Sequence, residues 1–159
     1  MMILGIDPGS RITGYGVIDY KHPHAECLTF GCIITSSKRP FYERLKKIYD
    51  DITQLIGSFQ PEWVVLEDIF YSQNVKSALQ LGQARGAALL AAINTNKRIS
   101  TYAPRVVKQA LTGKGSASKE QVRAMVAQML QLCDQKLELD ASDALAVALC
   151  HAYRWRINT

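Results

Sequence analysis

The sequence predicts one α/β domain, spanning residues 1–159, in which helices flank a five-stranded mixed sheet. Two observations lead to this prediction. The length is sufficient for one domain with a proper core and too short for two large domains. The hydrophobic pattern also changes along the chain between short apolar runs, typical of strands, and apolar residues three and four apart, typical of helices.

Each predicted strand is a short run of apolar residues that ends at a turn signal. The first strand is closed by Asp7-Pro8-Gly9, and a hairpin at 21–24 separates the second strand from the third. The predicted strands are 2–6, 12–20, 27–35, 63–66 and 99–102.

The predicted helices have apolar residues spaced as on one face of an amphipathic helix. Pro61 ends the first helix. The second helix is apolar on two sides, so one side can pack on the sheet while the other meets something else. The predicted helices are 41–59, 77–94, 105–111, 119–132 and 142–155.

The order of these elements predicts the topology. The connection between the third and fourth strands is long enough for a crossover, so the fourth strand can lie parallel to the first. Three antiparallel strands, then helix–strand–helix–strand and further helices, are the element order of the ribonuclease H-like fold. We therefore predict that fold.

Positive charge is concentrated in one part of the chain. There are 19 Lys and Arg residues against 14 Asp and Glu residues, a net charge of +5 that favours a polyanionic partner. Residues 97–123 hold all of this excess, with a single acid among many cations, and the rest of the chain is close to neutral. A concentrated patch suits phosphates better than a diffuse one. The cations of this segment are Lys97, Arg98, Arg105, Lys108, Lys114, Lys119 and Arg123.

Other features argue against a secreted, zinc-binding or membrane protein. No cysteine pair has CxxC spacing, and we expect Cys133 and Cys150, which lie in apolar helical patterns, to be buried free thiols. The opening residues lack the basic segment of a signal peptide, and the longest apolar run, 87–93, is too short to span a membrane. We expect a cytoplasmic location and no membrane association.

Four carboxylates lie at the ends of predicted elements. Asp7 follows the first strand and Glu67 the fourth, and parallel neighbouring strands would bring both side chains to the same edge of the sheet. Asp140 and Asp143 are three residues apart at the start of the last helix, so they share a face. If that helix packs over the sheet edge, all four acids meet.

Four ionised acids in a small site require a cation, because like charges raise one another's pKa. Mg²⁺ prefers oxygen ligands, and two such ions can activate water and stabilise the leaving oxygen of a phosphodiester. We therefore predict a site with two Mg²⁺ ions, for which Mn²⁺ can substitute. The predicted ligands are Asp7, Glu67, Asp140 and Asp143.

Each acid also has a simpler explanation. Asp7 fits turn chemistry, and Glu67 fits a solvated strand end. Asp140 fits an N-cap, with Asp143 favourable in the first helical turn. The metal site is favoured over these explanations because a single topology would bring all of the acids together.

Seven motifs occur in order along the chain: GIDPG (5–9), TGYG (13–16), LEDIF (66–70), LGQARG (81–86), VKQA (107–110), GKGSASK (113–119) and DASDALA (140–146). Together they resemble the bacterial Holliday-junction resolvases of the RuvC family, over essentially the whole chain. The first motif is weakly specific, since other proteins of the fold share it. The LGQARG block followed by the Gly/Ser loop is strongly specific.

The resemblance implies an activity and partners. It implies a homodimeric, metal-dependent endonuclease of DNA recombination and repair. Such an enzyme nicks two opposed strands of a four-way DNA junction symmetrically. It also implies the branch-migration proteins RuvA and RuvB as partners. The apolar second side of the helix at 77–94, rich in Gly and Ala, would let two copies approach closely, although packing within one subunit is the alternative.

The resemblance also implies roles for single residues. The four acids match the family's catalytic, metal-binding acids. Phe70 matches an aromatic residue that stacks on a base near the junction centre, although an aromatic residue just past a strand is more often buried. Lys108 and Lys119 match lysines at the scissile strand, where Lys119 can neutralise charge on the transferring phosphate. Asp68 stands where relatives often have Gln, and we expect it to point away from the metal.

Lys114 lies in the Gly/Ser loop and can approach phosphates, although a solvated loop is the alternative. Three rival functions remain open. A phosphate-binding ATPase of the actin-like or sugar-kinase type shares the fold, but it needs two domains. The others are a nuclease of the same superfamily acting on RNA, and a junction-binding protein without catalysis.

Overall fold

The computed structural model describes residues 1–68 and 74–157. In these residues the strands and helices follow one another in the predicted order. The elements are β1 (Met2–Asp7), β2 (Ile12–Lys21), β3 (His24–Ile34), α1 (Phe41–Phe59), β4 (Trp63–Glu67), α2 (Val75–Asn94), β5 (Arg98–Tyr102), α3 (Pro104–Thr112), α4 (Lys119–Met129) and α5 (Leu139–Ile157).

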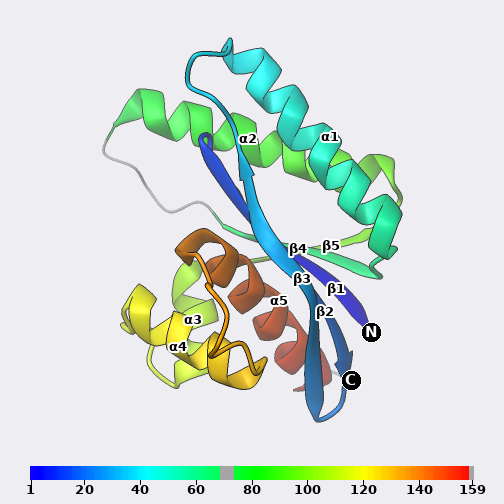
Figure 1. The fold of residues 1–159 in the computed structure, drawn as a ribbon, viewed down its shortest axis with the longest axis vertical. Coiled ribbons are helices and arrows are strands. Elements are labelled where there is room, and N and C mark those ends of the chain that lie inside the picture. Colours follow the sequence, from blue (N-terminus) through cyan, green and yellow to red (C-terminus); the bar gives the residue numbers. More distant parts are fainter. Residues whose placement is uncertain (69–73, 158–159) are drawn as a thin grey trace.

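The strands form one mixed sheet in the order β3-β2-β1-β4-β5 (Figure 1). β1 pairs antiparallel with β2, and β2 with β3, whereas β4 lies parallel to both β1 and β5. The predicted five-stranded mixed sheet is therefore confirmed. The crossover through α1 makes the C-terminal ends of β1 and β4 neighbours, with Ile6 opposite Leu66.

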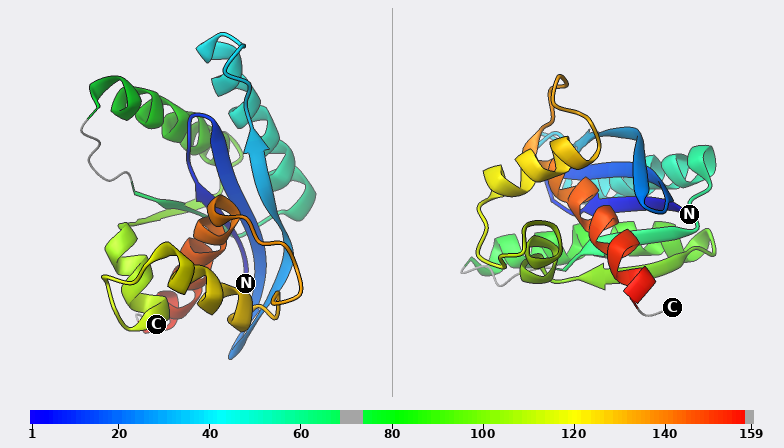
Figure 2. Two further views of the ribbon diagram at one scale, coloured as in Figure 1. Left: turned by 60° about the vertical axis from the view of Figure 1, so that its left-hand side comes forward. Right: turned by 90° about the horizontal axis from the view of Figure 1, so that it is seen from below.

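Helices cover both faces of the sheet, with α1 and α2 on one face and α3, α4 and α5 on the other (Figure 2). Successive side chains of a strand point to opposite faces. Leu4 and Ile6 accordingly belong to the core beneath α1 and α2, while Ile3 belongs to the core beneath α5. The same alternation puts Asp7 on the α5 face of the sheet.

Glycines let α5 lie directly on the backbone of β1 and β2. A Cβ atom added to Gly5 would lie 2.0 Å from the carbonyl oxygen of Ala144, and one added to Gly14 would lie 1.9 Å from that of Asp140. No side chain fits in so short a gap. This close packing fixes how far the first turn of α5 lies from the end of β1.

Several helix ends differ from the predicted ones. α2 begins two residues early because the Asn74 side chain caps it, accepting a hydrogen bond from the Ser77 N–H at 3.0 Å. α4 ends at Met129 rather than 132, and α5 begins at Leu139 rather than 142. Asp140 therefore lies inside the first turn of α5 and is not its N-cap.

The prediction of a buried thiol was wrong for one of the two cysteines. Cys150 is buried in the core on the α5 face, but Cys133 is exposed. The reason is that α4 ends before it, so Cys133 lies in the connection to α5 instead of on an apolar helix face. No helix in the described part of the chain combines the length and the apolar character needed to cross a membrane.

We predict that Gly5→Ala lowers the free energy of unfolding by at least ~2 kcal/mol, because the new methyl group overlaps the α5 backbone. Gly57→Ala is the matched control, since nothing lies within 4 Å of a Cβ added at this position of α1. Ala is the better helix former, so this control should gain roughly 0.5–1 kcal/mol. Urea denaturation measures both, and equal effects of the two substitutions would contradict close packing at Gly5.

Candidate active site

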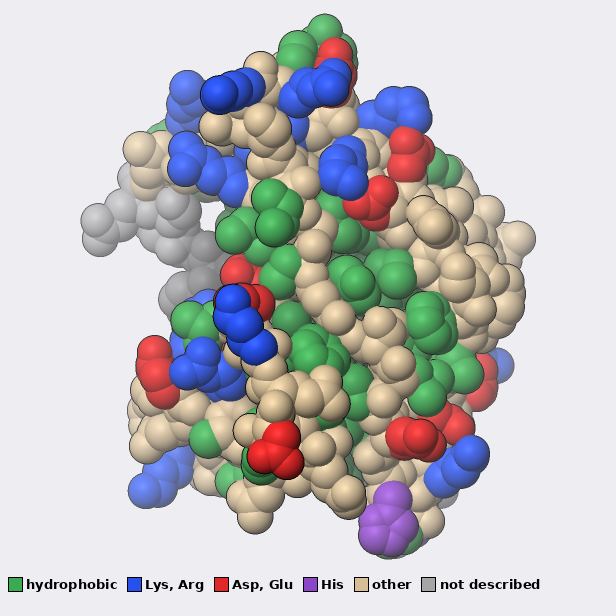
Figure 3. All heavy atoms as spheres, viewed as in Figure 1, with side chains coloured by type: hydrophobic (Ala, Val, Ile, Leu, Met, Phe, Trp, Pro, Cys, Tyr) green, Lys and Arg blue, Asp and Glu red, His purple; other side chains and the backbone are tan. Residues whose placement is uncertain are grey.

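The predicted acids come together at one edge of the sheet. Asp7 and Glu67 end neighbouring parallel strands, and both point to the face that α5 covers. The first turn of α5 brings Asp140 and Asp143 to the same place, and the charges of both act on Asp7. In Figure 3 acidic side chains lie near the centre of the face shown, adjoining basic side chains.

Burial and mutual repulsion make these carboxyl groups hard to ionise. The pKa of Asp7 is raised to about 8, mainly by burial and also by the charges of Glu67, Asp143 and Asp140, while Lys119 opposes the rise. The pKa of Glu67 is likewise raised to about 7, mainly by burial and also by the charge of Asp143. Ionisation of these groups therefore requires more positive charge than the protein itself supplies at the site.

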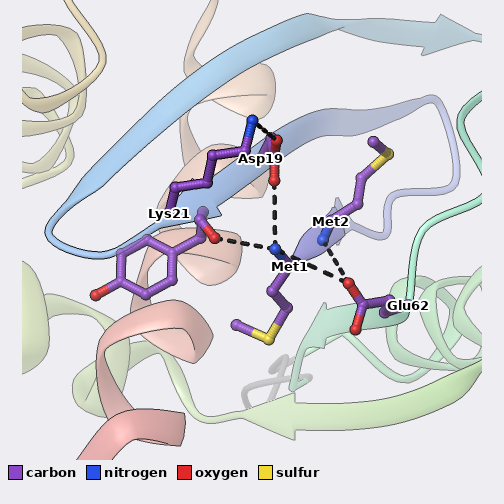
Figure 4. A network of polar contacts seen from close by, with 6 residues as sticks. Met1, Met2, Asp19, Lys21 and Glu62 are labelled. Carbon is purple, nitrogen blue, oxygen red and sulfur yellow. Dashed lines mark hydrogen bonds and ion pairs between the residues drawn. The ribbon is translucent and has the colours of Figure 1, made fainter.

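At the opposite end of β1, the negative charge of acidic side chains is balanced by nearby positive groups (Figure 4). There the Met1 amino group lies 3.3 Å from the Asp19 carboxylate and 3.9 Å from that of Glu62, and Lys21 lies 2.9 Å from Asp19. The hydrogen bond from Lys21 is the main reason why the pKa of Asp19 is lowered. Acids at the two ends of β1 thus have opposite pKa shifts.

One cation reaches into the acid cluster. The Lys119 ammonium group donates a hydrogen bond to Asp143 Oδ2 at 2.6 Å, and this bond raises the pKa of Lys119. Lys119 is the first residue of α4, where a capping box between Ser118 and Gln121 fixes the backbone. The Asp143 side chain is 11% exposed and that of Lys119 is 59% exposed, so the lysine enters from the surface.

The chemistry of this site fits a hard divalent cation, because its ligands are carboxylate oxygens that repel one another. Among the residues that the structure describes, no three acidic, histidine or cysteine side chains yet surround one point as metal ligands would. Lys119 holds one of the Asp143 oxygens by a hydrogen bond.

The family model described as crossover junction endodeoxyribonuclease RuvC matches residues 3–151. The chain belongs to the RuvC family. The relative of that description from Vibrio campbellii is 52% identical over 151 residues, which cover 95% of this chain and 86% of the relative. The relative of that description from Citrifermentans bemidjiense is 48% identical over 158 residues, which cover 99% of this chain and 96% of the relative.

Solved structures agree with this family membership. The Thermus thermophilus RuvC structure is 36% identical, with a TM-score of 0.90 over 100% of this chain and 98% of that one. T. thermophilus RuvC in complex with Holliday junction substrate is 34% identical, with a TM-score of 0.91 over the same shares. The predicted ribonuclease H-like fold is thus confirmed, and the chain is a crossover junction endodeoxyribonuclease rather than an ATPase.

A cleft of about 130 Å³ opens beside the acids of this RuvC-family chain. Glu67 and Asp143 line it together with Lys108 and Lys119, so the cleft holds acids and cations side by side. The charge of Lys108 offsets a small part of the rise in the pKa of Glu67. Of the predicted lysines, Lys108 and Lys119 therefore line this cleft.

Lys114 lies outside this cleft, on an exposed loop that a neighbouring glutamine holds in shape. The Gln109 side chain donates a hydrogen bond to the Gly113 carbonyl at 2.7 Å and accepts one from the Gly115 N–H at 3.0 Å. Thr112 Oγ1 also accepts a hydrogen bond from the Lys114 N–H at 3.2 Å. This role of Gln109 could not be predicted from the sequence, because a glutamine on a helix surface carries no pattern that indicates such contacts.

Asp68 points away from the acid cluster, as expected. Its side chain lies 2.7 Å from Arg85 of α2, and its N–H donates to the Tyr102 carbonyl at 2.9 Å. Both bonds hold the end of β4, where Glu67 is the preceding residue. Phe70, the predicted stacking residue, lies outside the described residues.

We predict that the metal-free protein loses stability as the pH rises from about 5 to about 8. The pKa values of Asp7 and Glu67 are raised in the folded state, so folding favours their protonated forms. That stabilisation is present near the unfolded-state pKa and disappears as the pH passes the folded-state pKa. Urea denaturation in EDTA at several pH values measures the slope.

Asp7→Asn should flatten this slope and raise the stability at pH 8 by on the order of 2 kcal/mol, because the buried group no longer ionises. Asp134→Asn, which replaces an exposed acid between α4 and α5, should leave the slope as in the wild type. Parallel slopes for the wild type and Asp7→Asn would contradict the assigned pKa shift.

Proposed function

We propose that this chain resolves Holliday junctions, hydrolysing one phosphodiester bond in each of two opposed strands. The observation that carries the proposal is the convergence of Asp7, Glu67, Asp140 and Asp143 at one edge of the sheet. Of these acids, Glu67 and Asp143 line one cleft together with Lys119. The T. thermophilus relative was solved with a Holliday junction substrate, which supports the same substrate here.

Membership of this nuclease family implies dependence on a divalent metal. We propose that this metal is Mg²⁺, with two ions per site and Mn²⁺ able to substitute, because hard oxygen ligands suit both ions. The proposed ligands are Asp7, Glu67, Asp140 and Asp143. When bound, the metal supplies an activated water and stabilises the leaving oxygen.

The chain's own residues would place the scissile phosphate. Lys108 and Lys119 line the cleft beside Glu67, where their ammonium groups can hold phosphate oxygens. Lys119 is close enough to the acids to oppose the charge that develops on the transferring phosphate. Lys114, fixed on its loop, would contact the backbone of an adjoining arm, and Phe70 would stack on a base near the junction centre.

We further propose a homodimer built through α2. Alanines on one side of this helix are fully buried against the sheet, whereas apolar residues on another side are exposed, Leu79 by 64% and Ile93 by 55%. A Cβ atom added to Gly82 or Gly86 on this open side would have nothing within 4 Å, so a second helix could approach closely. The open side consists of Val75, Leu79, Gly82, Gly86, Leu90 and Ile93.

Two-fold symmetry suits this arrangement, because a four-way junction offers two equivalent strands to two equivalent sites. A contiguous exposed apolar surface on a small protein commonly marks an interface. RuvA and RuvB as partners are proposed on the family resemblance alone. A cytoplasmic location is proposed on the sequence features described above.

Incubation of the protein with a synthetic four-way junction and Mg²⁺ tests the proposed activity. We expect paired symmetric nicks from the wild type. For Asp7→Asn we expect at least ~10³-fold slower cleavage, since a metal ligand is lost, with junction affinity changed little because binding rests on cations and shape. Asp134→Asn should cleave like the wild type. Sequencing gels and fluorescence anisotropy supply the two readouts.

Other results of this assay would select a rival. If the wild type binds the junction without forming product, it is a junction-binding protein. If it cleaves RNA in preference to the junction, it is a ribonuclease. A marked loss of junction binding in Asp7→Asn would also count against the assigned roles.

For the dimer, we expect Leu79→Glu to produce monomers at micromolar concentration and to abolish paired nicking, because it buries a charge in the interface. Ile34→Glu is the matched control, since Ile34 is 66% exposed but lies on β3, away from α2. Analytical ultracentrifugation gives the masses. A dimer that survives Leu79→Glu would place the interface elsewhere.

A further inference from the structure

The bond between Lys119 and Asp143 has a consequence for metal binding. Asp143 Oδ2 accepts a hydrogen bond from the Lys119 ammonium group at 2.6 Å, and the Asp143 side chain is largely buried. A carboxylate oxygen engaged this closely by an ammonium group is not available to a divalent cation at the same position. The ammonium group itself cannot be a metal ligand, because it has no lone pair.

We propose that Lys119 is an internal counter-ion that competes with the divalent metal for Asp143, and that a DNA phosphate relieves this competition by binding Lys119. The inference rests on the proposed function. Lys119 stays protonated throughout and exchanges only one anionic partner for another, the Asp143 carboxylate for a phosphate oxygen.

The structure provides for this exchange. The Lys119 backbone is fixed at the start of α4 by the Ser118–Gln121 capping box, but 59% of its side chain is exposed. Its ammonium group can therefore leave Asp143 by side-chain rotation alone, without unpacking the core. The cleft that Lys119 lines also holds Lys108, so a phosphate drawn to that cleft meets two cations.

Competition of this kind couples the two ligands. If bound phosphate withdraws Lys119, it raises the affinity for metal, and bound metal must raise the affinity for DNA by the same factor. The metal-free site would keep Asp143 neutralised, and the metal would bind fully only where a strand is present to be cut.

Calorimetric titration of the DNA-free protein with Ca²⁺ tests the competition directly. Lys119→Met should bind Ca²⁺ about tenfold more tightly than the wild type, within the usual range of coupling between sites. Lys119→Arg keeps the cation and should bind as weakly as the wild type. Lys108→Met removes a cation that lines the same cleft and acts on Glu67 through its charge, so it should change the affinity much less.

The coupling is read from junction affinity with and without Ca²⁺, by fluorescence anisotropy. The wild type should bind a synthetic junction more tightly in Ca²⁺, and Lys119→Met should lose most of this increase. Thermal melting followed by circular dichroism checks that each variant is folded. If Lys119→Met does not fold, the Ca²⁺ affinity of Lys119→Arg is still compared with that of the wild type.

The possible failures are distinguishable. Suppose that the wild type cuts junctions and binds Ca²⁺. The competition is then overturned, and the proposed function stands, if Lys119→Met binds Ca²⁺ no more tightly than the wild type. The same conclusion follows if Lys119→Arg binds Ca²⁺ about tenfold more tightly than the wild type. If Ca²⁺ binding is unaffected by Asp7→Asn and no junction is cut, the proposed function itself fails.

Discussion

The contact between α5 and the glycines of β1 and β2 determines where the acids of this protein can lie. Gly5 and Gly14 remove the side chains that normally keep a helix well clear of a sheet, and the α5 backbone occupies the space. The turn that carries Asp140 and Asp143 therefore lies directly over the end of β1. Two acids from a helix can then join two acids from strands that are sixty residues apart in the chain.

Bringing these acids together creates an electrostatic difficulty that the rest of the site answers. Burial and repulsion oppose ionisation of Asp7 and Glu67, and a hard cation is the simplest remedy. Lys119 supplies part of the missing charge from a different helix. The capping box that fixes the start of α4 thus helps to place this positive charge beside the acids.

Much of this arrangement could be predicted from the sequence, because it follows from periodicity and strand order. The strands were recognisable as apolar runs, and the parallel pairing of β1 with β4 placed Asp7 beside Glu67. Other features depend on contacts that leave no periodic trace. The bond from Lys119 to Asp143 links residues 24 positions apart. The close approach of the Asp140 backbone to Gly14 likewise joins distant parts of the chain.

The pair formed by Arg85 and Asp68 links α2 to the end of β4. Arg85 lies on α2, the helix whose open side we propose as the dimer interface, and Asp68 directly follows Glu67. In a dimer formed through α2, each catalytic edge would be tied through this ion pair to the symmetry axis. The geometry of the protein would then determine the distance between the two cleavage sites and impose it on the DNA.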